Sequence, residues 1–192
     1  MAINLQKGQR VDIGLTHVIV GLGWDPNTSG GADYDLDASA FMLNANKKLP
    51  RDEFFVFYNN QTSFDGAVAS SGDDTSGGNS DGGDDESLDV RLDKVSPQVE
   101  EIIFVVTIYD AIARRQNFGQ VRNAYIRVCN ADNGEEICRY DLDEDFSTQN
   151  GVEFGRLYRR NGAWRFEAMG NGSVCRAQFG LEDYLNKYNQ GD

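Results

Sequence analysis

The sequence predicts a mainly β protein, a β-sandwich of two sheets with a few short helices that include one at the C-terminus. Its apolar runs are short, rich in β-branched and aromatic residues, and bounded by Gly, Asp and Asn. Many short strands joined by Gly-rich turns are typical of a sandwich. At 192 residues and 40% hydrophobic composition, the chain is long enough for one domain with a core, and we expect that domain to span residues 1–192.

The expected strands are the runs in which β-branched and aromatic residues dominate. They lie at 17–24, 36–44, 54–58, 88–92, 102–109, 123–130, 136–142, 153–160 and 163–170.

The dipeptide Asn133-Gly134 predicts a two-residue type I′ hairpin turn. If residues are counted outward from this turn along both strands, Asp132 pairs with Glu135. Cys129 then lies opposite Cys138, close enough for a disulfide. We expect reduced thiols instead, because three cysteines, an odd number, favour a reducing compartment.

Helical segments are few. The segment 96–102 starts with Ser-Pro and predicts a capped turn, and 110–117 predicts a short helix. The segment 180–188 predicts a helix that packs on the sandwich, rather than one that binds a partner, through an i, i+3, i+4, i+7 stripe. The stripe consists of Leu181, Tyr184, Leu185 and Tyr188.

The net charge of −13 argues against nucleic-acid binding and against direct electrostatic docking on anionic lipid. The N-terminus has no apolar signal segment, and no apolar run approaches 18 residues, so we expect a cytoplasmic protein without a membrane span.

Composition also argues against an enzyme. The single histidine, His17, lies beside an apolar strand, and the G-x-S-x-G match at 78–82 has no later histidine to serve as a base. One histidine without a Cys-x-x-Cys motif makes a zinc site unexpected. The composition does not exclude a carboxylate pair for glycoside hydrolysis, although no specific motif supports one.

Eleven of the 31 acidic residues occupy two loop-like stretches without an intervening Lys or Arg. The stretch 72–89 contains seven: Asp73, Asp74, Asp81, Asp84, Asp85, Glu86 and Asp89. The stretch 25–37 contains four: Asp25, Asp33, Asp35 and Asp37. A hard cation such as Ca²⁺ takes six to eight oxygen ligands, so this composition predicts metal binding over simple solvated loops.

The alternation Asp33, Asp35, Asp37 places three carboxylates on one face of an extended chain, about 7 Å apart from one to the next, with Leu36 facing the core. Neither acidic stretch fits an EF-hand, so a site must be assembled from separate loops. Without metal, two such charges 4 Å apart repel by about 4 kcal/mol at an effective dielectric near 20.

The tetrapeptide Tyr-Asp-Leu-Asp occurs twice, at 34–37 and at 140–143. The second copy lies within the alternation Asp141, Asp143, Asp145. This copy follows Arg139 and precedes several other arginines, so we expect structural salt bridges here and metal binding at the first copy.

Four motifs in order carry a family resemblance: GLGWD at 21–25, DLDAS at 35–39, FVFYNN at 55–60 and GDDE at 83–86. Together they resemble the TerD family of bacterial tellurium-resistance and stress-response proteins. The match extends from 3–8 (INLQKG) to the C-terminal helix.

The resemblance implies a C2-like β-sandwich that binds Ca²⁺, more than one ion, through loop carboxylates. It implies partners among other tellurite-resistance operon proteins, one of them membrane-associated, which leaves open a peripheral position at the inner membrane through partners. The ligands it implies are Asp25, Asp35, Asp37, Asn59 or Asn60, Asp73, Asp81, Asp84, Asp85 and Glu86, with Asp33 and Asp74 as weaker candidates.

Three hypotheses follow. The leading one is a non-enzymatic calcium-binding module that meets its partners in a calcium-dependent way. The alternatives are calcium-dependent attachment to a membrane surface, as in some C2 domains, and tellurite handling by Cys129, Cys138 or Cys175.

Overall fold

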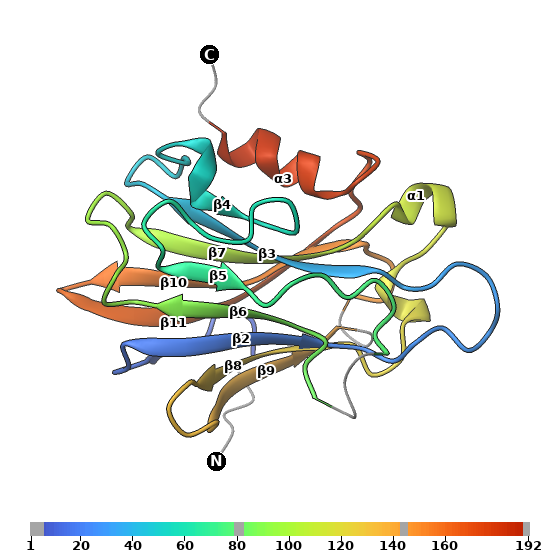
Figure 1. The fold of residues 1–192 in the computed structure, drawn as a ribbon, viewed down its shortest axis with the longest axis horizontal. Helices are drawn as coiled ribbons and strands as arrows, with labels where there is room; N and C mark the ends of the chain where they lie inside the picture. The colour runs from blue at the N-terminus through green and yellow to red at the C-terminus, as the bar shows by residue number, and fades with distance from the viewer. Residues whose placement is uncertain (1–5, 79–82, 143–145, 190–192) are drawn as a thin grey trace.

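Two antiparallel sheets pack face to face in the computed structural model, which describes residues 6–78, 83–142 and 146–189 (Figure 1). One sheet has six strands in the order β1-β11-β10-β7-β3-β4, and the other has five in the order β5-β6-β2-β8-β9. The predicted fold class, mainly β in two sheets with few helices, is confirmed.

The strands of the described residues are joined by turns and by longer loops. They are β1 Arg10–Asp12, β2 His17–Gly23, β3 Leu36–Leu43, β4 Phe55–Val56, β5 Val68–Ser70, β6 Glu86–Arg91, β7 Glu101–Ile108, β8 Tyr125–Asn130, β9 Glu136–Asp141, β10 Gly151–Arg160 and β11 Ala163–Ser173. The helices among the described residues are α1 Ala111–Arg114 and α3 Leu181–Tyr188, with 3₁₀ turns at Asp52–Phe54 and Phe118–Gln120.

The central strands β3 and β7 of the six-stranded sheet are buried along their whole length. One face of β3 packs in the sandwich interior, and the other lies under α3, where Phe41 stacks on Phe55 at 4.3 Å and contacts Tyr188 at 5.1 Å. Both strands are mostly apolar, as two buried faces require.

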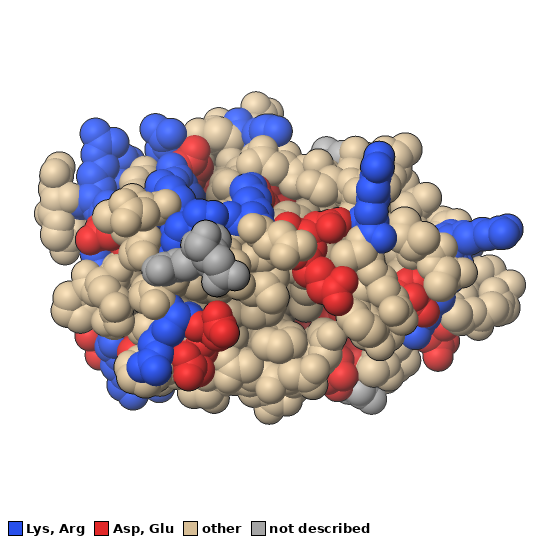
Figure 2. Space-filling view, turned by 90° about the horizontal axis from the view of Figure 1, so that it is seen from above, with Lys and Arg blue, Asp and Glu red and all other residues tan. Residues whose placement is uncertain are grey.

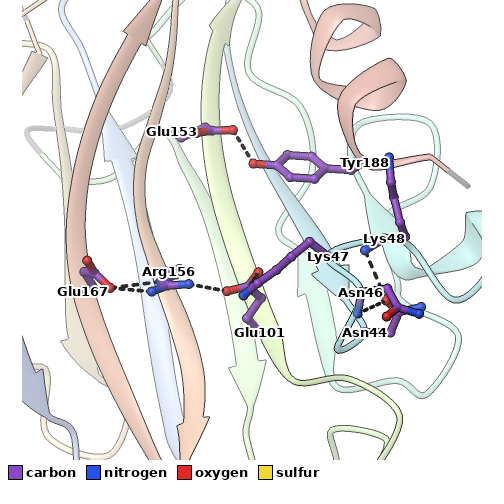
Figure 3. Close-up of polar contacts among 9 residues, drawn as sticks. All are labelled: Asn44, Asn46, Lys47, Lys48, Glu101, Glu153, Arg156, Glu167 and Tyr188. Atoms are coloured by element: carbon purple, nitrogen blue, oxygen red, sulfur yellow. Dashed lines mark hydrogen bonds and ion pairs between the residues drawn. The ribbon is translucent and has the colours of Figure 1, made fainter.

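Helix α3 lies on the outer face of the six-stranded sheet (Figure 1). The predicted stripe is confirmed, because Leu181, Tyr184 and Tyr188 are buried. Beneath the helix, the carboxylate of Glu153 accepts hydrogen bonds from the Tyr188 hydroxyl and, at 2.5 Å, from Lys187 Nζ. The helix is therefore held by one buried acid as well as by apolar packing (Figure 3).

A second buried acid organises the same face. Glu101 is only 1% exposed and pairs with Arg156 at 2.6 Å and with Lys47 at 2.7 Å. Arg156 also reaches Glu167 at 2.7 Å, so acids and bases alternate across β7, β10 and β11 (Figure 3). Many Lys and Arg side chains gather toward the left end of this face (Figure 2).

The expected element at 54–58 differs from the structure. A 3₁₀ turn precedes it, and only Phe55 and Val56 form a strand, because Phe57 and Asn60 bond to each other in a tight turn. The short strands β1 and β5 were not predicted, since three residues carry too little periodicity to recognise. The turn at 96–102 is confirmed by the bond from Val99 N to Ser96 O, at 3.0 Å.

The predicted β8–β9 hairpin is present, but its turn and register are not those of a type I′ turn. Asn130 bonds to Glu135 across a four-residue loop, and of the central pair only Gly134 has a positive φ, of 73°. An irregularity between Val128 and Cys129 then places Cys138 opposite Val128 instead of Cys129. The cysteines are free, as expected.

Antiparallel strands bring three loops to one end of the sandwich: 24–35 after β2, the described parts 71–78 and 83–85 of the loop after β5, and 109–124 after β7 (right in Figure 1). Both acidic stretches of the sequence therefore meet at this end, although more than 30 residues separate Asp35 from Asp73.

Candidate metal centre

Three carboxylates converge where β3 begins. Asp35, Asp37 and Asp73 each offer an oxygen atom, and these atoms lie within 4.8 Å of one another. The period of two along β3 directs Asp35 and Asp37 to the same face, and Asp73 comes from the loop after β5. The arrangement offers only hard oxygen ligands, so these side chains could hold a metal ion.

Asp37 is the most deeply buried of the three, at 3% exposure. Its Oδ2 has no hydrogen-bond partner among the described residues. Burial raises the pKa of Asp37 to about 9, and the neighbouring charges of Glu86, Asp35 and Asp73 add to the shift. An orphaned, buried carboxylate oxygen is costly unless a cation or a proton compensates it, and this oxygen fits a cation ligand.

Asp35 lies at the rim of the cluster. The pKa of its carboxyl is raised to about 6, chiefly by burial and also by the charge of Asp73, while Arg114 opposes both effects. The guanidinium of Arg114 stands 3.9 Å from Asp35 Oδ2 and also donates to the carbonyl of Asp33 at 3.4 Å. Sequence reasoning missed this base, because it comes from α1, far along the chain.

Glu86, the first residue of β6, joins the two sheets beside the cluster. One of its oxygens accepts the backbone N–H of Ala38 at 2.9 Å, and the other accepts that of Asp74 at 3.2 Å. Burial raises the pKa of Glu86 to about 8, and the two N–H bonds counteract that shift. Glu86 therefore fastens the 72–77 segment along the edge of β3, next to the three converging carboxylates.

Asp74 shapes the segment that carries Asp73. Its Oδ1 accepts the backbone N–H groups of Ser76 and Gly77, at 2.9 and 3.1 Å. Gly77 lies against Trp24, since a methyl group added there would come within 2.4 Å of the indole nitrogen. Asp74 thus serves the local conformation of the loop, and Asp73 projects toward β3.

Asp84, predicted as a ligand, is engaged by cations of the protein itself. Arg127 binds both of its oxygens, at 2.8 and 3.1 Å, and the Tyr125 hydroxyl donates to it at 3.0 Å. Its carboxylate also fills the space above Gly21, where a methyl group would come within 2.0 Å of Oδ2. The structure does not bring Asp84 into the three-carboxylate cluster.

Asp25 and Asp85 lie at a different place, on the walls of an open cleft of about 380 Å³ that Trp24 and Arg139 also line. Asp25 accepts from the side-chain amide of Asn123 at 2.7 Å, and Asp85 accepts the backbone N–H of Trp24 at 2.8 Å. These acids are separate from Asp35, Asp37 and Asp73.

Three other candidates, Asn59, Asn60 and Asp33, lie outside the cluster. The Asn60 amide donates to the carbonyl of Phe55 at 2.6 Å, and Asn59 is exposed. Asp33 is exposed as well, and Asp81 lies outside the described residues.

Thr107 is a polar residue that sequence reasoning overlooked. It pairs directly with Asp37 in the β3–β7 register, and its hydroxyl is buried without a hydrogen-bond partner in the described part of the chain. A single threonine within the apolar run of β7 was the available signal.

In the second Tyr-Asp-Leu-Asp, at 140–143, the expected salt bridge is present at Asp141. Asp141 pairs with Arg139 at 3.1 Å on the surface, whereas Asp143 and Asp145 lie outside the described residues.

The three cysteines are buried. Burial raises the pKa of Cys138 to about 12 and that of Cys175 to about 11, which disfavours the reactive thiolate at neutral pH.

A family model described as the TerD domain matches residues 1–188. The chain belongs to the TerD family. The tellurium resistance protein TerD of Serratia marcescens is 51% identical over 192 residues, covering 94% of this chain and 98% of that protein. General stress protein 16U of Bacillus subtilis is 48% identical over 178 residues, covering 90% and 91% of the two chains.

Solved structures share the TerD-family fold. A homologue of telluride resistance protein (TerD) from Streptomyces coelicolor A3(2) superposes with a TM-score of 0.70 at 24% identity, over 83% of this chain and 91% of that one. A crystal structure of a protein of unknown function reaches 0.76 at 20% identity, over 92% and 99%. Among the described residues, no helix has the length and apolar character needed to cross a membrane.

Proposed function

We propose that this protein is a non-enzymatic calcium-binding member of the bacterial tellurium-resistance and stress-response system. In this proposal Asp35, Asp37 and Asp73 hold Ca²⁺. The observation that carries it is the convergence of these carboxylates within 4.8 Å around a buried Asp37 oxygen that has no hydrogen-bond partner among the described residues.

The donor set favours calcium over magnesium. Ca²⁺ accepts six to eight oxygens in a flexible geometry, whereas Mg²⁺ requires a near-ideal octahedron. Here a rigid strand supplies Asp35 and Asp37, and a Gly- and Ser-rich loop supplies Asp73, so the set can adapt to the larger ion. Carbonyl oxygens and water would complete the shell. A second ion would draw on Asp25 and Asp85 across the neighbouring cleft.

Calcium would act on the loop that carries Asp73. Repulsion among the acids of this end opposes closure of the loop onto β3, and a divalent cation removes that opposition. The same segment packs on Trp24, which lines the cleft. Binding would therefore order one end of the sandwich and lower its negative charge, and we propose that other tellurium-resistance operon proteins recognise that ordered end.

Calorimetric titration of chelator-treated protein with Ca²⁺ tests the proposal. We expect micromolar or tighter binding, and a loss of at least tenfold in affinity for the double variant Asp35→Asn, Asp73→Asn. Asp141→Asn is the matched control, because Asp141 is an acid of the repeated tetrapeptide that pairs with Arg139 outside the cluster. Equal affinity in all three proteins, or no heat with the wild type, would refute the assignment.

A further inference from the structure

An apolar groove lies between α3 and the edge strand β4. Phe55, Phe57 and Leu185 line this groove, whose volume is about 370 Å³, and Asp52 and Glu53 stand at its rim. Its size falls in the range of sites that bury a ligand or an anchoring side chain.

Stacked aromatic rings form the floor of the groove, and the backbone of its edge strand is already hydrogen-bonded. Phe57 stacks on Phe55 at 4.5 Å, and Phe55 stacks in turn on Phe41. The outward backbone groups of the edge strand are already used, since Asn60 bonds to the carbonyl of Phe55 through its amide and to Phe57 through its backbone. Strand addition is therefore blocked, and an occupant must dock through an apolar side chain.

Helix α1 presents side chains with matching chemistry. Ile112 is 51% exposed and is one of three large apolar side chains that the described residues expose. Arg115, three residues on, is exposed and has no ion-pair partner in the described part of the chain. The segment thus offers an apolar anchor beside a cation, and the groove offers an apolar floor beside two carboxylates, of which Glu53 also pairs with Arg51 at 3.0 Å.

We propose that α1 of a second copy docks in this groove, with Ile112 on the apolar floor and Arg115 facing Asp52 and Glu53. Figure 1 shows α1, α3 and β4 along the same side of the molecule. Groove and helix can therefore meet reciprocally in a two-fold dimer, as an isologous interface requires.

The two contacts are small, so we expect a weak and reversible dimer, with a dissociation constant in the range of about 10 μM to 1 mM. Neither the groove residues nor Ile112 and Arg115 belong to the metal cluster, although Arg114 of the same helix stands 3.9 Å from Asp35. The association should therefore persist in the presence of a chelator, which separates its test from that of the calcium site.

Sedimentation velocity over a concentration series tests the dimer. The wild type should associate as its concentration rises, whereas Ile112→Glu and Arg115→Glu should each weaken association at least tenfold. Val174→Glu is the matched control, because Val174 is 60% exposed but belongs to neither surface. The charge swap Arg115→Glu with Glu53→Arg should restore part of the lost association.

A wild type that stays monomeric at every concentration would overturn the proposal. So would association that Ile112→Glu leaves unchanged, or that Val174→Glu weakens equally.

Discussion

Replacing Asp37 by Asn should stabilise the metal-free protein at neutral pH and should greatly reduce its stabilisation by calcium. Burial raises the pKa of Asp37 to about 9, against about 4 in an unfolded chain. The folded protein therefore keeps a proton on Asp37 that the unfolded chain releases, and stability falls as the pH rises from about 4 toward 9. An amide at this position does not titrate, so the variant escapes that loss.

The magnitude follows from the size of the shift. Each pH unit within this window costs about 1.4 kcal/mol, so from pH 5 to pH 8 the wild type should lose up to about 4 kcal/mol relative to the variant. We expect about 2 to 4 kcal/mol, because the neighbouring acids share the titration. Comparing two pH values cancels the intrinsic difference between a buried acid and a buried amide.

Urea unfolding in chelator at pH 5 and pH 8 measures this difference for wild type, Asp37→Asn and the surface control Asp141→Asn. The control should follow the wild type at both pH values. Adding Ca²⁺ at 100 times its dissociation constant should then stabilise the wild type by about 2.7 kcal/mol and Asp37→Asn far less. Parallel pH profiles for wild type and Asp37→Asn would refute the reasoning.

Three further predictions concern residues outside the three-carboxylate cluster. Asp84→Asn should lower the free energy of unfolding by about 1 to 3 kcal/mol, because it weakens the bidentate pair with Arg127. Calorimetry should show that its calcium affinity is close to that of the wild type, and a large loss of calcium affinity would make Asp84 a ligand. Glu153→Gln should loosen α3 by weakening its bonds to Tyr188 and Lys187, which limited proteolysis within the helix would detect; unchanged cleavage would contradict it. A thiol reagent at pH 7 should label the cysteines only as fast as the protein opens, because burial raises the pKa of Cys138 to about 12. Rapid labelling of the folded protein would support tellurite handling by the cysteines instead.

The fold was largely predictable because its strands are long enough to show their composition. The two central strands and the C-terminal helix were recognisable from apolar runs and from one stripe. The β8–β9 turn was not, because Asn133-Gly134 is compatible with several turn types. A four-residue loop and a bulge change the strand register, so that Cys138 lies opposite Val128 instead of Cys129. The packing of the whole sheet determines that register.

The site was predictable in part. The alternation of Asp35 and Asp37 places both on one face of any extended chain, and the loop composition indicated Asp73 among several acids. The sequence could not distinguish Asp84 from Asp73, because Arg127, which engages Asp84, lies 43 residues away. Thr107 was hidden for the same reason, since its contact with Asp37 depends on the strand register.

Anomalous diffraction from crystals grown with Ca²⁺ tests the central claim most directly. We predict an anomalous peak bonded to oxygens of Asp35, Asp37 and Asp73, at about 2.3 to 2.6 Å from each. A map without a peak at these carboxylates, from crystals whose protein binds calcium in solution, would place the ion elsewhere and contradict the assignment.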